Sequence, residues 1–226
     1  MNYLALCQRV RQEVGYSGSD STVVAATGDW KRICDWTAQA WVEIQESQDA
    51  WEWMWVKKSF NTVTNQGEYP YASAPLSLTD FARWRDKSFR IYKSSIGDEH
   101  LLDQRGYVDF RNTFLIGTSV STYAYPHAIT VSPSDSLILA LPPDGVYTVT
   151  GEYYTTPSEL SADADIPEMP SRYHMLIVYR AMQSCGLYES ATELVQHAAA
   201  RYVEMMANLM HDELEELSVD RSFGEN

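Results

Sequence analysis

The hydrophobic pattern of this chain changes its period twice, and this feature most constrains the fold. Apolar residues recur at helical spacing to about residue 50, alternate from residue 56 to about Thr156, and return to helical spacing from Ser171. The segment Trp51-Glu-Trp-Met-Trp55 marks the first change and predicts entry into extended structure. Helices at both ends of a chain, with strands between them, are expected to pack on each other.

We therefore predict an α+β fold in which the N- and C-terminal helices form one helical bundle. A central inserted antiparallel β-rich lobe, barrel-like or sandwich-like and containing a short helix, completes it. The predicted domains are 1–55 with 157–226, which includes a C-terminal arm, and the inserted lobe 56–156.

The N-terminal part of the chain predicts two helices. The first follows Asn2, a suitable N-cap, and continues to Val14. The second runs from about Asp29 through the forties. Its predicted core face consists of Trp30, Ile33, Thr37, Trp41 and Ile44.

The last third predicts two more helices. A helix from about Ser171 is apolar on almost every face, which indicates deep burial, and Gly186 can end it in the left-handed conformation. Ser190-Ala-Thr-Glu193 then has the form of a capping box and would open a long helix to Leu217.

The middle of the chain predicts strands at Ser59–Thr64, Phe89–Tyr92 and Ala128–Val131. Two further strands, Leu137–Leu141 and Val146–Tyr154, flank Pro142-Pro-Asp-Gly145, which is typical of a hairpin turn. A helical insert is expected from Asp98 to about Phe114, with Asp98-Glu99 at its N-terminus.

Charge and cysteine content exclude several classes of function. The 226 residues carry a net charge of −14, and the part from Pro157 onward contributes −9, with 13 Asp or Glu against 4 Lys or Arg. This argues against sequence-nonspecific nucleic-acid binding, which needs a basic surface. The 3 cysteines are far apart and lie among apolar residues, which favours buried thiols and a reducing compartment. Neither an export signal nor a membrane-spanning segment is expected.

Catalytic and metal-binding signatures are lacking, so we expect a protein that is not an enzyme and binds neither metal nor cofactor. The 5 histidines are scattered, and Gly15-Tyr-Ser-Gly-Ser19 follows a helix where a nucleophile elbow requires a strand. Paired carboxylates could still serve a glycan hydrolase. The candidates are Asp163, Asp165, Glu168, Asp98 and Glu99, although their positions favour linker and helix-cap roles.

One local positive patch contains Arg83, Arg85 and Lys87 around Trp84. It is either a solvated strand face or a surface that faces an acidic neighbouring subunit, and we take these four residues as candidates for an inter-subunit contact.

The order of these segments resembles the head-to-tail adaptor proteins of tailed bacteriophages, which include the tubular tail A-type and portal-proximal adaptors of short-tailed phages. The segments that carry the resemblance are Leu4–Val14, Trp30–Trp55, Leu141–Tyr154 and Asp163–Tyr179. Together they cover nearly the whole chain.

The resemblance implies a structural virion connector at the head–tail junction, assembled in the cytoplasm of the host bacterium. Its partners would be copies of itself in a homo-oligomeric ring, a dodecamer in such proteins, together with the portal protein and a tail or nozzle protein. DNA would pass through the lumen without specific binding during genome ejection. The alternatives are a tail-associated glycan hydrolase and another neck or tail-completion protein.

In such adaptors the C-terminal segment engages the portal, and the distal β lobe, here within Ser59–Thr155, contacts the tail. The matching portal-interaction candidates are Leu209, Leu214, Leu217, Val219, Arg221 and Phe223. We also expect part of the acidic surface to line the lumen, because like charge prevents DNA from binding there.

Overall fold

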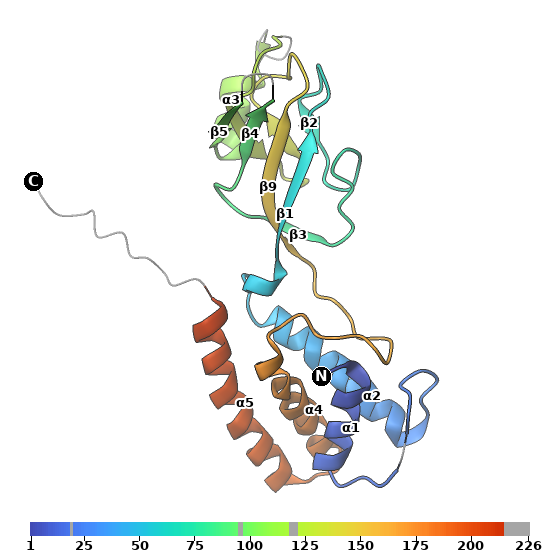
Figure 1. Cartoon of the computed structure of the whole chain (residues 1–226). Coiled ribbons are helices and arrows are strands. Elements are labelled where there is room, and N and C mark those ends of the chain that lie inside the picture. Colours follow the sequence, from blue (N-terminus) through green and yellow to red (C-terminus); the bar gives the residue numbers. More distant parts are fainter. Residues whose placement is uncertain (19, 95–96, 118–121, 215–226) are drawn as a thin grey trace, which may run out of the picture. The chain divides into compact units, whose positions relative to one another are not determined.

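The computed structural model describes residues 1–18, 20–94, 97–117 and 122–214. The chain divides into two compact units, a helical unit of Met1–Met54 with Pro157–Asn226 and a sheet unit of Trp55–Thr156 (Figure 1). The described residues combine α-helices at both ends of the chain with mainly antiparallel strands in the middle. The predicted α+β fold is therefore confirmed.

Two helices at the N-terminal end follow the predicted boundaries closely. Helix α1 spans Tyr3–Glu13, and the side-chain oxygen of Asn2 accepts a hydrogen bond from the Ala5 N–H at 3.0 Å, as expected of an N-cap. Helix α2 spans Gly28–Glu46. All five residues predicted for its core face are buried.

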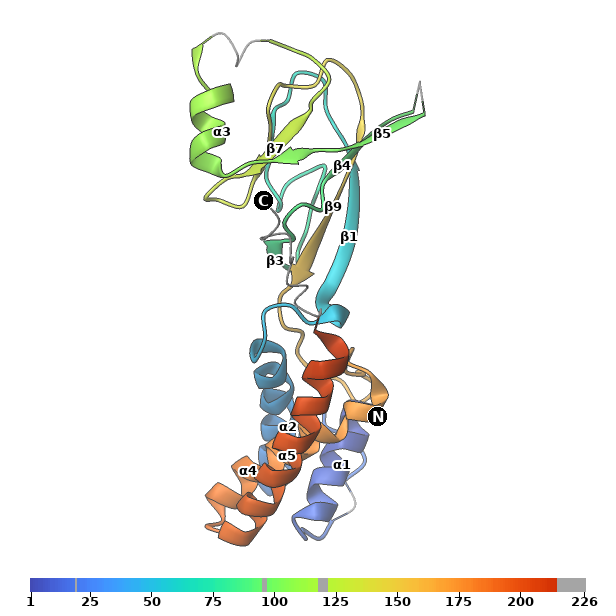
Figure 2. The ribbon, with the colours of Figure 1, turned by 90° about the vertical axis from the view of Figure 1, so that its left-hand side faces the viewer.

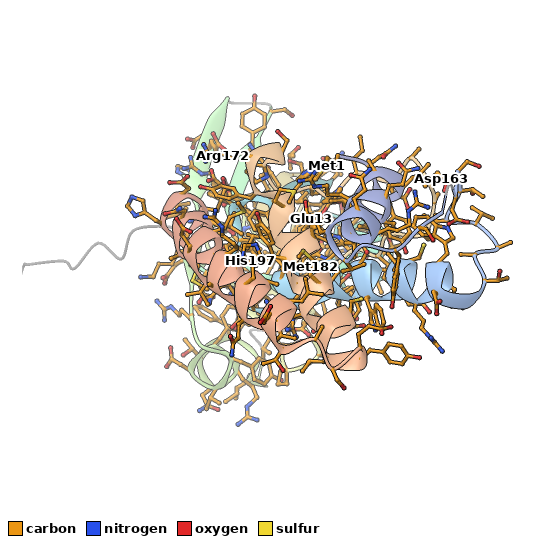
Figure 3. The ribbon with its side chains drawn as sticks, turned by 90° about the horizontal axis from the view of Figure 1, so that it is seen from below. Met1, Glu13, Asp163, Arg172, Met182 and His197 are labelled. Atoms are coloured by element: carbon orange, nitrogen blue, oxygen red, sulfur yellow. The ribbon has the colours of Figure 1, made fainter. Side chains whose placement is uncertain are left out.

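The C-terminal helices complete the helical unit. A 3₁₀ turn at Ser171–Tyr173 leads into α4, Met175–Tyr188, which contacts α1, α2 and α5, Thr192–Glu213. Figure 3 shows α4 between α5 and α1, with Met182 labelled on it; this side chain is 1% exposed. The predicted deep burial of this helix is confirmed.

Three details of the C-terminal helices differ from prediction. Gly186 does not end α4 but lies inside it, where a Cβ atom would come within 2.8 Å of a Val195 methyl group. Ser190 takes the left-handed conformation instead (φ 57°), so it cannot cap α5, and no side-chain cap bond forms there. The helix ends at Glu213, and Leu217 lies outside the described residues.

In its described residues, the sheet unit contains two small sheets and the α-helix α3 (Figure 2). The first sheet has the order β1-β9-β4-β5, with β3 also paired to β9, and every pairing in it is antiparallel. Its strands are β1 Trp55–Asn61, β3 Phe81–Trp84, β4 Arg90–Lys93, β5 Asp98–Leu101 and β9 Thr148–Thr155. A 3₁₀ turn, Glu52–Met54, precedes β1, so the extended structure begins only at Trp55.

The second sheet has the order β2-β8-β7-β6. Its strands are β2 Glu68–Tyr69, β6 Asp103–Gln104, β7 Ala128–Val131 and β8 Leu137–Leu139. Helix α3, Tyr107–Phe114, contacts β7. Strand β6 is parallel to β7, which departs from the predicted antiparallel pattern.

Aromatic side chains fill the core of the sheet unit. The rings of Phe81, Trp84 and Phe89 follow one another at centroid distances of 5.0 and 5.5 Å. Residues of both sheets belong to the same buried cluster, including Ile91 of the first and Ile129 of the second. The two sheets thus share one core.

Two predictions for the central region are wrong. Strands β8 and β9 do not form a hairpin, because β8 pairs with β2 and β7 whereas β9 pairs with β1, β3 and β4. The two prolines between them have no N–H to donate, and their carbonyls accept from other segments, Pro142 from Ala124 and Pro143 from Asn65. The residues act as a corner between sheets.

The helical insert expected from Asp98 begins only at Tyr107. Asp98 and Glu99 are therefore not a helix cap but part of β5, where alternate side chains face opposite sides. The segment is extended because it pairs with β4.

Candidate interaction surfaces

Strand β3 separates the residues of the predicted positive patch into two faces. Trp84 points inward, is 6% exposed, and donates from its indole N–H to the carbonyl of Asp135 at 2.9 Å. Arg83 and Arg85 lie on either side of it in the sequence and so point to the opposite face. Trp84 therefore packs mainly in the core of the sheet unit.

The two arginines form an arginine–aromatic cluster with Trp55, Glu152 and Tyr154. The Arg83 guanidinium lies 4.4 Å from the ring centre of Tyr154, and that of Arg85 lies 3.7 Å from the ring centre of Trp55. Glu152 accepts from Arg85 and from the Trp55 indole N–H, each at 3.1 Å. Planar guanidinium groups stack favourably on aromatic rings, which explains how the cluster holds its two arginines.

Lys87, the third basic residue of the patch, occupies the turn after β3. Its backbone has a left-handed conformation (φ 58°), and its N–H donates to the side-chain oxygen of Gln104. The ammonium group is not part of the arginine–aromatic cluster, and the side chain is exposed. The structure thus groups two of the four candidates and separates the other two.

The same outer face continues along the sheet as a polar surface. Cross-strand partners on β1 and β9 hydrogen-bond through their side chains, Ser59 with Thr150 at 2.9 Å and Asn61 with Thr148 at 3.0 Å. Small hydroxyl and amide side chains in register make a face that stays solvated in the single chain.

The portal candidates begin on α5. Leu209 is fully buried in the helical unit, and Leu214 is half-buried just after the helix. The remaining candidates lie outside the described residues: Leu217, Val219, Arg221 and Phe223. Leu209 therefore fixes α5 to its own unit.

The carboxylates considered for hydrolysis have structural partners or lie apart. Asp163 accepts from the Val23 N–H at 2.6 Å, and Asp165 accepts from the N–H groups of Ser161 and Ala162 at 2.7 Å each. These backbone bonds lower the pKa of Asp165 because they favour its charged form. Glu168 accepts a long hydrogen bond from the Ser158 hydroxyl at 3.4 Å. Across the described ranges, no group of His, Cys, Asp and Glu is arranged to hold a metal.

The acidity belongs almost entirely to one unit. The helical unit has 21 Asp or Glu against 8 Lys or Arg, a net charge of −13, whereas the sheet unit has 10 against 9, a net charge of −1.

All three cysteines are buried free thiols, as predicted, and burial raises the pKa of Cys185.

Sequence reasoning missed an apolar cleft of about 310 Å³ in the sheet unit. Its apolar lining comes from the end of α3, from β8 and from the corner that follows it: Phe114, Leu115, Ile138, Leu139, Ala140 and Pro142. The predicted hairpin would have paired β8 with β9 and left no corner between the two sheets. The cleft beside this corner therefore could not be expected from the predicted strand pairing.

Comparison with known proteins now gives the family. A family model described as SU10 adaptor protein matches residues 1–224, nearly the whole chain, and no curated protein matches it. In the described part of the chain no helix is long and apolar enough to cross a membrane. An adaptor of this kind is a structural component of the virion that binds other phage proteins. The chain belongs to the SU10 adaptor protein family and has the general role of a bacteriophage adaptor, as the resemblance implied.

Proposed function

We propose that this protein forms a homo-oligomeric ring, a dodecamer, that joins the portal at the capsid vertex to the tail. The family match over residues 1–224 carries this proposal. The ring would be assembled in the host cytoplasm and reside at the head–tail junction. Genomic DNA would pass through its lumen during ejection without specific binding.

The division into two units supports a role between two different partners. Each unit has its own buried residues and its own surface chemistry, acidic for the helical unit and nearly neutral for the sheet unit. We propose that these units act as separate domains, the helical one engaging the portal and the sheet one engaging the tail or nozzle protein. An adaptor with two chemically distinct surfaces can discriminate between its neighbours.

The portal-engaging arm would follow α5. Leu209 anchors that helix in its unit, and the sequence beyond offers apolar residues at Leu217, Val219 and Phe223, with Arg221 among them. Apolar and arginine side chains typically dominate the binding energy of protein interfaces. In the sheet unit, Arg83, Arg85 and Lys87 remain candidates for contact with an acidic surface of a neighbouring subunit.

Part of the acidic surface of the helical unit would line the lumen. With a net charge of −13 it repels phosphates and gives no counterion-release binding, so DNA can slide. A reconstruction of the assembled ring with a net basic channel wall would contradict this part of the proposal.

Mass photometry of the purified chain, alone and mixed with the portal protein of the same phage, tests the proposal. We expect a ring on the portal, because an acidic chain can need a complementary surface before its copies associate. Replacing Val219 and Phe223 together with Asp should abolish portal binding, whereas Ser218→Asp with Ser222→Asp adds the same charge and should retain it. Monomers under both conditions would refute the ring.

No observation favours the alternative of a glycan hydrolase. Asp163 and Asp165 are engaged by backbone N–H groups, and the family is one of adaptors. Peptidoglycan release by the purified chain, abolished by one acid-to-amide substitution, would reverse this conclusion.

A further inference from the structure

The first sheet of the sheet unit ends in two strands with one unpaired edge each. Strand β1 pairs only with β9, and β5 pairs only with β4, among the residues that the structure describes. Figure 1 shows them on opposite sides of β9 and β4. A strand edge carries a row of unused N–H and C=O groups, which another strand can satisfy.

The two edges have opposite charge. Strand β1 carries Lys57 and Lys58 and no acid, and neither lysine forms an ion pair with another described residue. Strand β5 carries Asp98 and Glu99, and within the described chain its carboxylates have one close nitrogen partner, His100 Nε2 of the same strand, 2.7 Å from an Asp98 oxygen. Each edge therefore offers charges that the other edge could pair.

We propose that β1 of one copy pairs with β5 of the next, so that the first sheet continues from subunit to subunit. This inference rests on the proposed ring and names the contact that builds it. Neighbouring strands alternate in direction along β1-β9-β4-β5, so β5 runs opposite to β1. A copy repeated about an axis roughly parallel to the strands then meets its neighbour in the antiparallel sense, through a head-to-tail contact that can close a ring.

One antiparallel register gives every residue of β5 a partner on β1 of the neighbouring copy. It places Lys57 opposite Glu99 and Lys58 opposite Asp98. It also places Trp55 opposite Leu101 and Val56 opposite His100. Leu101 and Val56 are 61% and 37% exposed in the single chain, so this register would cover two apolar side chains as well as pair four charges.

The faces of the sheet agree with this register. Lys57 lies opposite Glu152 of β9, and Glu99 lies opposite Tyr92 of β4, which pairs with Thr148 of β9. Residues 148 and 152 share a face, so Lys57 and Glu99 project from the same side of the sheet. Lys58 and Asp98 project together from the other side.

Charge also selects against the symmetric alternatives. Pairing β1 with β1 of a second copy would bring Lys57 and Lys58 of both copies together, and pairing β5 with β5 would collect four acids. Directly opposed like charges destabilise a strand pair. The heterologous contact is the one of the three that pairs opposite charges.

Cysteine cross-linking tests the contact. It is carried out under whichever of three conditions gives an oligomer of the wild-type chain: in solution, on the portal or in virions. The native cysteines are buried, so their background is low. A mixture of Lys57→Cys and Glu99→Cys chains should form disulfide-linked dimers, because opposed strand positions lie within disulfide reach. The doubly substituted chain should form a ladder whose longest band counts the copies. Lys57→Cys mixed with His100→Cys is the matched control, since these side chains project from opposite faces.

Charge reversal provides the second measurement. Lys57→Glu with Lys58→Glu should raise the concentration needed for assembly on the order of tenfold, and adding Asp98→Lys with Glu99→Lys should restore it. Lys31→Glu with Arg111→Glu makes the same net change elsewhere and should have little effect.

The outcomes separate the two proposals. A wild-type chain that forms no oligomer under any of the three conditions refutes the ring and this contact with it. An oligomer whose mixture fails to cross-link, or in which either single variant cross-links to itself, refutes the β1–β5 contact and leaves the ring standing.

Discussion

Replacing Gly151 with alanine should destabilise the sheet unit. The new Cβ would lie 2.6 Å from Cε1 and 2.7 Å from Cδ1 of Phe89, a fully buried ring. Carbon atoms pack at about 3.5–4.0 Å, so the ring would have to retreat by about 1 Å. The Trp84 ring leaves little room for this movement, because its centroid lies only 5.5 Å from the centroid of the Phe89 ring.

The magnitude follows from two opposing effects. Overpacking a filled core costs about 1–3 kcal/mol, and replacing a strand glycine by alanine regains about 0.5–1 kcal/mol. We expect a net loss of about 1–2 kcal/mol in the free energy of unfolding, which moves the urea midpoint by roughly 0.5–1 M. Tryptophan fluorescence follows the transition, since Trp84 belongs to this core.

Two comparisons make the test specific. Gly145→Ala is the matched control, because its Cβ would meet nothing closer than 3.8 Å. In a Phe89→Leu background the cost of Gly151→Ala should fall, since the clashing ring atoms are gone. Wild-type stability of Gly151→Ala, or an equal cost in both backgrounds, would show that the reasoning is wrong.

Three further predictions concern single side chains. Leu209→Ala should cost about 2–5 kcal/mol in urea unfolding, whereas Val203→Ala on the same helix, 67% exposed, should stay within about 0.5 kcal/mol. Burial lowers the pKa of His174 below its usual 6.5, so the free energy of unfolding should fall as pH drops below that value. In His174→Gln the melting temperature should depend less on pH in this range. Burial, with a hydrogen bond to Asp80, raises the pKa of Tyr153 to about 12, so the free energy of unfolding should fall as pH rises from 10 to 12. Alkaline unfolding should show a smaller fall in Tyr153→Phe.

Helices proved predictable where one continuous pattern determines them. The core face of α2 and the cap at Asn2 depend on residues within a few turns of each other, and both are confirmed. Strand β7 also has the predicted bounds, because a short β-branched run indicates a strand wherever it pairs.

Pairing and chain reversal were less predictable, because they depend on distant partners. Pro142-Pro-Asp-Gly145 has good turn chemistry, but the carbonyl of Pro143 accepts from Asn65 and the strands on either side join different sheets. Gly186 has the residue type of a helix end, yet its missing side chain serves close packing against Val195. A glycine allows both roles, and its sequence neighbours do not distinguish them.

The same difference explains why the proposed subunit contact could not be read from the sequence. Lys57-Lys58 and Asp98-Glu99 are each an ordinary charged pair on a strand, and each alone is the usual protection of an exposed edge against aggregation. Only the strand order places one pair on each unpaired edge of the same sheet, with antiparallel sense and matching faces. Protective charges of one sign on both edges would keep copies apart. Charges of opposite sign on the two edges still disfavour self-pairing of either edge, but they permit the head-to-tail contact, so the same residues that protect each edge would direct assembly.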